Sequence, residues 1–195
     1  TVVSWGTGPA VPAGLTSVTW IAAGCGFNLA RKSDGTVVTW GGNTFGQTTV
    51  PAGTTPAISV AAGEKHSLAL RANGTVAAWG DNTFDQTNTP GTATSVTAIA
   101  CGYDHNLALK ADGTVVAWGR NDSGQSTVPA GLTGVTAIAA GAYHSLAVKN
   151  DGTLVAWGDN SYGQTTIPSG ITTATQVAAG EKHSLALLAD VGALC

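Results

Sequence analysis

The chain has 195 residues and a formal net charge of −3, since eight Lys and Arg stand against 11 Asp and Glu. Its apolar share of 43% is too high for a disordered chain, no apolar run approaches the ~20 residues of a membrane span, and nucleic-acid binding lacks the basic excess that drives it. Thr, Val, Gly and Trp are frequent and strong helix formers are scarce, so the composition favours an all-β fold.

An internal repeat with a period of 39 residues dominates the sequence. The repeated positions are a Gly, a His, a Trp followed by Gly, a Gln and a Pro. The Gly and Trp series are Gly24, Gly63, Gly102, Gly141 and Gly180, and Trp40, Trp79, Trp118 and Trp157. Trp5 lies 35 residues before Trp40 while Pro12 keeps the register, so the first copy lacks four residues between Trp5 and Pro12.

Each copy predicts four short strands, which in the fourth copy span 135–140, 144–148, 153–157 and 164–167. The second and third strands are joined by two-residue hairpin signals, in which Asn or Asp and Gly tolerate positive φ. These pairs are Asp34-Gly35, Asn73-Gly74, Asp112-Gly113 and Asp151-Gly152. Four antiparallel strands per copy predict a β-propeller blade. A solenoid is the alternative, but its atypical polar end repeats are not seen.

The two ends of the sequence complement each other. Residues 1–5 match a third strand, and residues 177–180 and 183–187 match a first and a second strand. We therefore predict a single domain over 1–195, a β-propeller of five four-stranded blades whose last blade is closed by both termini. The blades are predicted at about 16–54, 55–93, 94–132, 133–171 and 172–195 plus 1–15. A fragment of a larger ring, or strand exchange between chains, is the alternative.

Variation between copies is confined to one predicted face. The hairpins barely differ, whereas the turn before each His and the loop after each Trp-Gly do, and such differences can encode recognition. Aromatic residues there supply rigid contact area. The candidate partner-binding residues are Tyr103, Asp104, Tyr143, Phe45, Phe84, Tyr162, Glu64, Lys65, Glu181 and Lys182. The alternative for the three loop aromatics is packing between blades.

Other repeated residues are predicted to be structural. One Trp per blade would fill the wedge between sheets, at Trp5, Trp40, Trp79, Trp118 and Trp157. One His follows each Gly turn, at His66, His105, His144 and His183. Four imidazoles at one blade position could surround a metal ion, but hydrogen bonding to the local backbone is favoured. Trp20 has no equivalent in other copies and is either an edge filler or an exposed anchor.

The sequence has no motif of a catalytic site, so we expect no enzyme activity, cofactor or metal. Cys25, Cys101 and Cys195 predict no disulfide framework, although the terminal cysteine could pair between molecules. The chain has no initial Met and no signal peptide, and it is poor in Lys and Arg. These features favour a secreted or cell-surface protein.

The repeat unit resembles that of the regulator of chromosome condensation superfamily. The resemblance rests on Ala-Ala-Gly-x-x-His-Ser-Leu-Ala-Leu, then Asp-Gly-Thr-Val-x-Ala-Trp-Gly, then Asn-x-x-Gly-Gln-Thr-Thr-Val-Pro, and covers nearly the whole chain. The short unit looks most like bacterial propellers of the β-lactamase inhibitor protein II type. Those carry aromatic residues in the turn before the His, a pattern that Tyr103 and Tyr143 meet here.

The favoured function is a non-catalytic binding module that presents its variable face to a protein partner, as the resemblance to β-lactamase inhibitors implies. No nucleic-acid or membrane-spanning role is expected, and the chain is predicted to be a monomer or a strand-exchanged oligomer. The alternatives are a structural repeat domain of a larger surface protein and a lectin-like glycan binder.

Overall fold

The computed structural model describes residues 1–189, which form five small antiparallel sheets and no helix. Four sheets have three strands in chain order and the fifth has two. The strands are β1 (Val18–Ala23), β2 (Phe27–Lys32) and β3 (Val37–Gly41); β4 (Ala57–Ala62), β5 (His66–Arg71) and β6 (Val76–Gly80); β7 (Val96–Cys101), β8 (His105–Lys110) and β9 (Val115–Gly119); β10 (Val135–Ala140), β11 (His144–Lys149) and β12 (Leu154–Gly158); and β13 (Ala174–Ala179) and β14 (Ser184–Leu188). The all-β, blade-like repeat is therefore as predicted.

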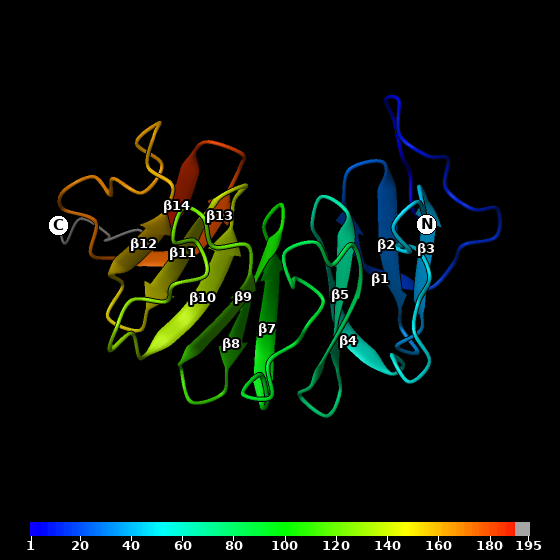
Figure 1. Ribbon diagram of the computed structural model, residues 1–195, viewed down its shortest axis with the longest axis horizontal. Coiled ribbons are helices and arrows are strands. Elements are labelled where there is room, and N and C mark those ends of the chain that lie inside the picture. Colours follow the sequence, from blue (N-terminus) through cyan, green and yellow to red (C-terminus); the bar gives the residue numbers. More distant parts are fainter. Residues whose placement is uncertain (190–195) are drawn as a thin grey trace, which may run out of the picture.

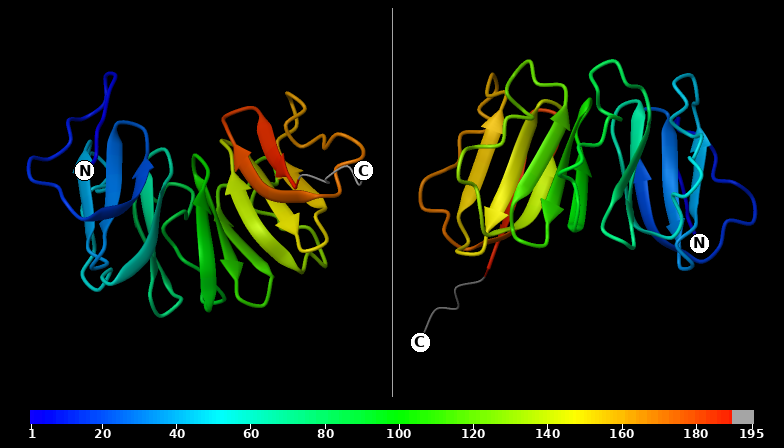
Figure 2. Two further views of the ribbon diagram at one scale, coloured as in Figure 1. Left: turned by 180° about the vertical axis from the view of Figure 1, so that it is seen from behind. Right: turned by 60° about the horizontal axis from the view of Figure 1, so that its bottom comes forward.

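The sheets follow one another along an arc, with the N-terminal and C-terminal segments at opposite ends (Figure 1 and both views of Figure 2). The first strand of each sheet contacts the first strand of the next, so β1, β4, β7, β10 and β13 line one side of the arc. The structure does not show the predicted closure by a shared last blade. Among the described residues, β14 pairs only with β13, and residues 1–5 form no strand.

Two further expectations differ from the structure. The segments predicted as fourth strands, such as residues 164–167, are turns and irregular backbone, because side chains already occupy their backbone groups. Trp5, predicted to pack as the other repeated tryptophans do, is 89% exposed. Its predicted neighbours in residues 183–187 lie at the other end of the arc (Figure 1). In contrast, Trp79, Trp118 and Trp157 are buried, and Trp40 is half-buried.

The core is divided into slices, each between two neighbouring sheets. One slice packs Leu68 and Leu70 of β5 against Val96 of β7 and Trp118 of β9. The slices on either side repeat this arrangement around Trp79 and Trp157. Because every slice needs residues from two sheets, a sheet with no neighbour leaves apolar side chains exposed.

The Gly-His pair fixes the spacing of the sheets. The ring of His105 lies directly against the Cα of Gly102, where a Cβ would overlap it. The His105 Nε2 bonds the Ser145 Oγ of the next sheet at 3.0 Å, and the equivalent bond joins His66 to Asn106 at 2.7 Å. The histidine side chains therefore bond the next sheet, and the prediction that they bond the backbone of their own turn was wrong. His183, which has no following sheet, is exposed.

The repeated Gln loop ties the sheets together on their outer side. The main-chain oxygen of Gln86 accepts a hydrogen bond from Trp118 Nε1 at 3.0 Å and another from Asn106 Nδ2 at 2.8 Å. Gln47 and Gln125 accept the same two kinds of bond from the sheets that follow them. Each Gln loop is therefore held by hydrogen bonds from the sheet that follows it.

Candidate functional site

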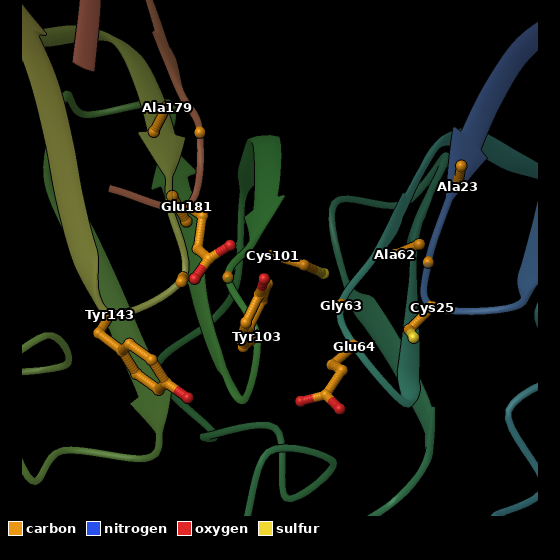
Figure 3. Close-up of a pocket in the computed structure, with 16 residues that line it drawn as sticks. Ala23, Cys25, Ala62, Gly63, Glu64, Cys101, Tyr103, Tyr143, Ala179 and Glu181 are labelled. Carbon is orange, nitrogen blue, oxygen red and sulfur yellow. The ribbon is translucent and has the colours of Figure 1, made fainter. Parts of the chain in front are cut away.

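A groove of about 680 Å³ lies where β1, β4, β7, β10 and β13 end, and we call it the mouth groove. Its floor consists of the repeated Ala and Gly residues and of Cys101, which ends β7, and its larger lining side chains come from the turns that follow these strands. These side chains are Cys25, Glu64, Tyr103, Tyr143 and Glu181. In Figure 3, Tyr103 lies between Glu181 and Glu64, which come from sheets on either side of it. The small side chains of the inner strands leave the groove open, and the turns supply its aromatic and charged side chains.

A ladder of main-chain hydrogen bonds holds the turns in line. The amide of Cys25 donates to the Glu64 oxygen at 3.2 Å, that of Glu64 to Tyr103 at 2.9 Å, and that of Tyr103 to Ala142 at 3.2 Å. These donors and acceptors stand at the same position in successive copies. The side chains at the mouth therefore project from a fixed backbone, which lowers the entropy lost when a partner binds.

Two tyrosines form the aromatic part of the groove. The rings of Tyr103 and Tyr143 meet edge to face, with centroids 5.6 Å apart and planes at 72°. Burial raises the pKa of the Tyr103 hydroxyl, and the charges of Glu181 and Glu64 raise it further. Tyr103 is therefore a neutral hydrogen-bond donor set among carboxylates.

Arg120 lies at the centre of the contacts on this face, and sequence reasoning missed it. Its guanidinium is 4.6 Å from the ring centroid of Phe84 and 5.2 Å from that of Tyr143. It also bonds Asp122 at 2.7 Å and Asp104 at 3.4 Å. Arg120 thus joins loop and turn residues of three consecutive copies into one cluster.

A signal for Arg120 was present in the sequence. The equivalent positions hold Gly42, Asp81 and Asp159, so the third copy alone has a cation there. The turn position before the His shows the opposite change, because Asp104 stands where Lys65 and Lys182 occur. The third copy therefore carries the charge pair of the second in reversed order.

The reversal leaves a buried amide without a partner. Gln86 Nε2 donates to Asp81 at 3.1 Å, and Gln164 Nε2 donates to Asp159 at 2.7 Å. Within residues 1–189, Gln125 Nε2 is buried and has no hydrogen-bond partner, because its loop carries Arg120 instead of Asp. An unsatisfied buried donor costs about 1–3 kcal/mol. A local departure from the repeat pattern of this kind is typical of functional sites.

The electrostatics of Asp104 follow from its burial. The carboxyl is largely buried, and this raises its pKa, as does the charge of Glu64, while the hydrogen bond from Arg120 lowers it. Asp104 is buried whereas Arg120 is half-buried, so the pair joins a carboxylate shielded from solvent to a guanidinium that a partner can reach.

The remaining predicted contact residues lie outside the mouth groove. Lys65 stands 5.5 Å from the Phe45 ring and bonds Glu64 at 3.0 Å. Lys182 stands 4.7 Å from the Tyr162 ring and bonds Glu181 at 3.4 Å. Phe45 and Tyr162 are exposed and do not pack between blades, whereas Phe84 is half-buried beneath Arg120. Tyr162 and Lys182 line a separate groove beside β14.

The parts that the structure describes, residues 1–189, form no metal-binding cluster of three or more His, Cys, Asp or Glu. Cys25 is exposed at the mouth, and burial raises the pKa of the Cys101 thiol. Cys195 lies outside the described residues. The same residues contain no helix with the length and apolar character of a membrane span.

The opposite face varies less. Three hairpins there bear the same ion pair, Lys32 with Asp34 at 3.8 Å, Lys110 with Asp112 at 3.1 Å and Lys149 with Asp151 at 3.0 Å, while the second copy has Arg71 and the uncharged Asn73 at these positions. Diversity between copies is therefore concentrated at the mouth.

Comparison with known proteins identifies the repeat in four consecutive copies. A search of curated proteins found no match. The family model described as "Regulator of chromosome condensation (RCC1) repeat" matches residues 18–47, 57–86, 96–125 and 135–164, more than half of the chain.

Solved structures with the same fold include two of Prp20, the yeast RCC1. One, in a complex with Kap60, has 26% identity and a TM-score of 0.74 over 89% of this chain and 54% of that chain. The other, from Saccharomyces cerevisiae, has 28% identity and a TM-score of 0.73 over 87% and 55%, and its description refers to binding of Gsp1p and histones. Human WBSCR16, at 23% identity, has a TM-score of 0.75 over 93% of this chain and 60% of that chain.

The chain spans about half the length of these solved structures. Both the repeated sequence unit and the arc of small sheets correspond to them. On the match of four consecutive repeats, the chain belongs to the RCC1 repeat family.

Proposed function

We propose that this chain is a non-catalytic binding module whose mouth groove, together with the Arg120 cluster, receives a protein partner. The observation that carries the proposal is the reversed charge pair of the third copy. It leaves Gln125 unsatisfied and places a guanidinium between two aromatic rings. Aromatic residues and Arg in a fixed setting are the usual source of binding energy in protein interfaces.

The asymmetry of the groove supports one protein partner over repeated glycan sites. The turn residues of successive copies are Cys25, Glu64, Tyr103, Ala142 and Glu181, so no two neighbouring sheets offer the same lining. Identical sugar sites would need identical linings. Related structures support a protein partner, since the yeast protein is described with Kap60, Gsp1p and histones. A secreted or cell-surface location stays a prediction.

The experiment compares baits that differ only at the groove. Wild type, a Tyr103→Ala/Tyr143→Ala variant and a Lys110→Ala variant on the opposite face are immobilised and exposed to purified class A β-lactamase, Gsp1p and histones, and to a proteome. We expect a protein that binds wild type and Lys110→Ala equally and loses about 2 kcal/mol or more with the tyrosine variant. Partners that bind all three baits alike, or that are lost with Lys110→Ala instead, would contradict the proposal.

The assay with class A β-lactamase decides whether this enzyme is the partner. Inhibition of that enzyme that is weakened by the tyrosine variant would identify an inhibitor of this class. Lack of inhibition together with groove-dependent capture of another protein would keep the binding module and reject that partner.

A further inference from the structure

The two ends of the arc expose apolar residues whose equivalents inside the arc are buried. Leu185 and Leu187 of β14 are 62% and 58% exposed, whereas the equivalent Leu146 and Val148 of β11 are 5% and 1% exposed. At the other end, Ile21 of β1 is 60% exposed and its equivalent Val60 is 3% exposed. Among residues 1–189, no sheet follows β13 and β14, and no sheet precedes β1, β2 and β3. Their shapes are therefore complementary in the way that neighbouring sheets are.

The groove beside β14 is the place where a third strand would lie. It measures about 430 Å³ and is lined by apolar residues such as Leu146, Ile167 and Leu185, together with the Gln164 loop. Among residues 1–189, the Gln164 main-chain oxygen accepts only the Ser184 hydroxyl, at 2.7 Å. In the preceding copy, the equivalent oxygen of Gln125 accepts from Ser145 and also from Trp157 Nε1. The groove therefore lacks a strand with an indole.

The N-terminal segment has the sequence of such a strand, although it does not form one in this structure. Residues 1–6 read Thr-Val-Val-Ser-Trp-Gly, and residues 114–119, which include β9, read Thr-Val-Val-Ala-Trp-Gly. Yet Val3 and Trp5 are exposed, and residues 1–5 lie irregularly against β1 and β2. The segment carries the sequence of a third strand, but among residues 1–189 no second strand pairs with it.

Geometry favours a second molecule as the source of this strand. The two ends of one chain lie at opposite ends of the arc (Figure 1). The joints between sheets are fixed by the His bonds and the ladder of turns, so closing the arc would require every joint to bend. The arc also matches only part of a larger propeller, since the alignment with Prp20 covers 54% of that chain.

We propose that residues 1–6 of a second copy of this chain add to the free edge of β14 as its third strand. The register follows from β11 and β12, in which Ser145 pairs with Trp157 and Leu146 with Ala156. Applied to β14, it pairs Ser184 with Trp5 and Leu185 with Ser4 of the second copy. Trp5 then enters the groove and donates to Gln164, and the Ile21 end of the second copy packs on β14. The contact is head to tail, so it repeats into a larger ring or an open chain.

Cross-linking between two differently labelled chains tests the register. In a background of Cys25→Ser, Cys101→Ala and Cys195→Ser, chains with Ser4→Cys are mixed with chains with Leu185→Cys and oxidised. We expect a disulfide-linked heterodimer, and at least ten-fold less product when Thr1→Cys replaces Ser4→Cys. A double variant that closes within one chain, with no product from the mixture, would overturn the proposal.

A second measurement keeps the proposal testable if the cysteine-free background does not fold. The mass of the wild-type chain in solution is followed by light scattering from low to high concentration. We expect it to rise above the monomer value of 19.3 kDa. Val3→Asp and Leu187→Asp, both at exposed positions, should weaken association at least ten-fold, whereas Ile58→Asp, an exposed apolar position at neither end, should associate as wild type does. A wild type that remains monomeric, or end variants that associate unchanged, would overturn it.

Discussion

The repeated histidine is a neutral joint between sheets rather than an ionisable surface group. Burial lowers the pKa of His66 and His144, and it lowers the pKa of His105 to about 3, with the neighbouring His66 and His144 contributing. Each ring donates through Nε2 to Asn or Ser of the next sheet. Protonation would place a charge in the core, so these groups couple the stability of the arc to pH.

Stability should therefore fall in acid. An unfolded histidine binds its proton near pH 6.5, whereas the folded His105 resists protonation until about pH 3. Between these values the unfolded state binds more protons, so the free energy of unfolding decreases as the pH is lowered. Each buried histidine contributes a slope of up to about 1.4 kcal/mol per pH unit. Urea titrations from pH 7 to pH 4 measure the slope, and His105→Gln should reduce it by about one such unit. A slope unchanged by this variant would contradict the neutral joint.

The Gly before each His should tolerate no side chain. In Gly102→Ala the new Cβ would overlap the His105 ring and approach the Gly141 main-chain oxygen to 2.5 Å. Overpacking of this kind costs about 1–3 kcal/mol. Thermal unfolding should show this loss, whereas Gly91→Ala, which has open space around it and no positive φ, should stay within about 0.5 kcal/mol of wild type. Equal effects of the two variants would show that the Gly-His contact does not set the sheet spacing.

The loop after each third strand is the element in which sequence reasoning both succeeded and failed. The repeated Gln was expected to be a buried amide, and Gln86 and Gln125 are fully buried. The same segment was predicted as a fourth strand because it is rich in β-branched residues, such as Thr165, Thr166 and Ile167, before a Pro. Side chains override that pattern: Asn160 Oδ1 accepts from the Thr165 amide and Gln164 Oε1 from the Tyr162 amide, so these groups cannot join a ladder. Strand propensity does not report such local competition.

Restoring the repeat pattern should separate stability from binding. Asp104→Lys/Arg120→Asp gives the third copy the charge order of Lys65 and Asp81, and provides an acceptor for Gln125 Nε2. We expect the free energy of unfolding to rise by about 1 kcal/mol, and any mouth-groove partner to be lost. Chemical denaturation measures the first effect. As a control, Arg120→Ala alone leaves the buried Asp104 carboxylate without its cation and should lower the free energy of unfolding. If the double variant is no more stable than Arg120→Ala, then Gln125 does not lack an acceptor because of Arg120, and the account of this loop is contradicted.

At the scale of the whole molecule, the repeat predicted the order of the sheets but not the curvature of the arc. The all-β class, the hairpins and the variable face follow from residues at fixed spacing. Curvature depends on inter-sheet contacts, such as His66 with Asn106, whose distances no single-chain pattern reveals. The sequence match between residues 1–5 and a third strand identified a complementary segment but not the molecule that it pairs with. Trp5, predicted to be buried in the same chain, is exposed because residues 1–5 form no strand and the predicted neighbours in residues 183–187 lie at the other end of the arc.

The distance between the two ends of one chain tests the open arc most directly. In the background of Cys25→Ser, Cys101→Ala and Cys195→Ser, spin labels are attached at Ser4→Cys and Leu185→Cys in one chain, which is diluted with a large excess of unlabelled chain so that only pairs within a molecule contribute. The open arc predicts a long distance without dipolar broadening. Strong broadening, which labels on neighbouring strands with Cβ atoms roughly 5 Å apart would give, would show that the chain closes on itself and would contradict the account.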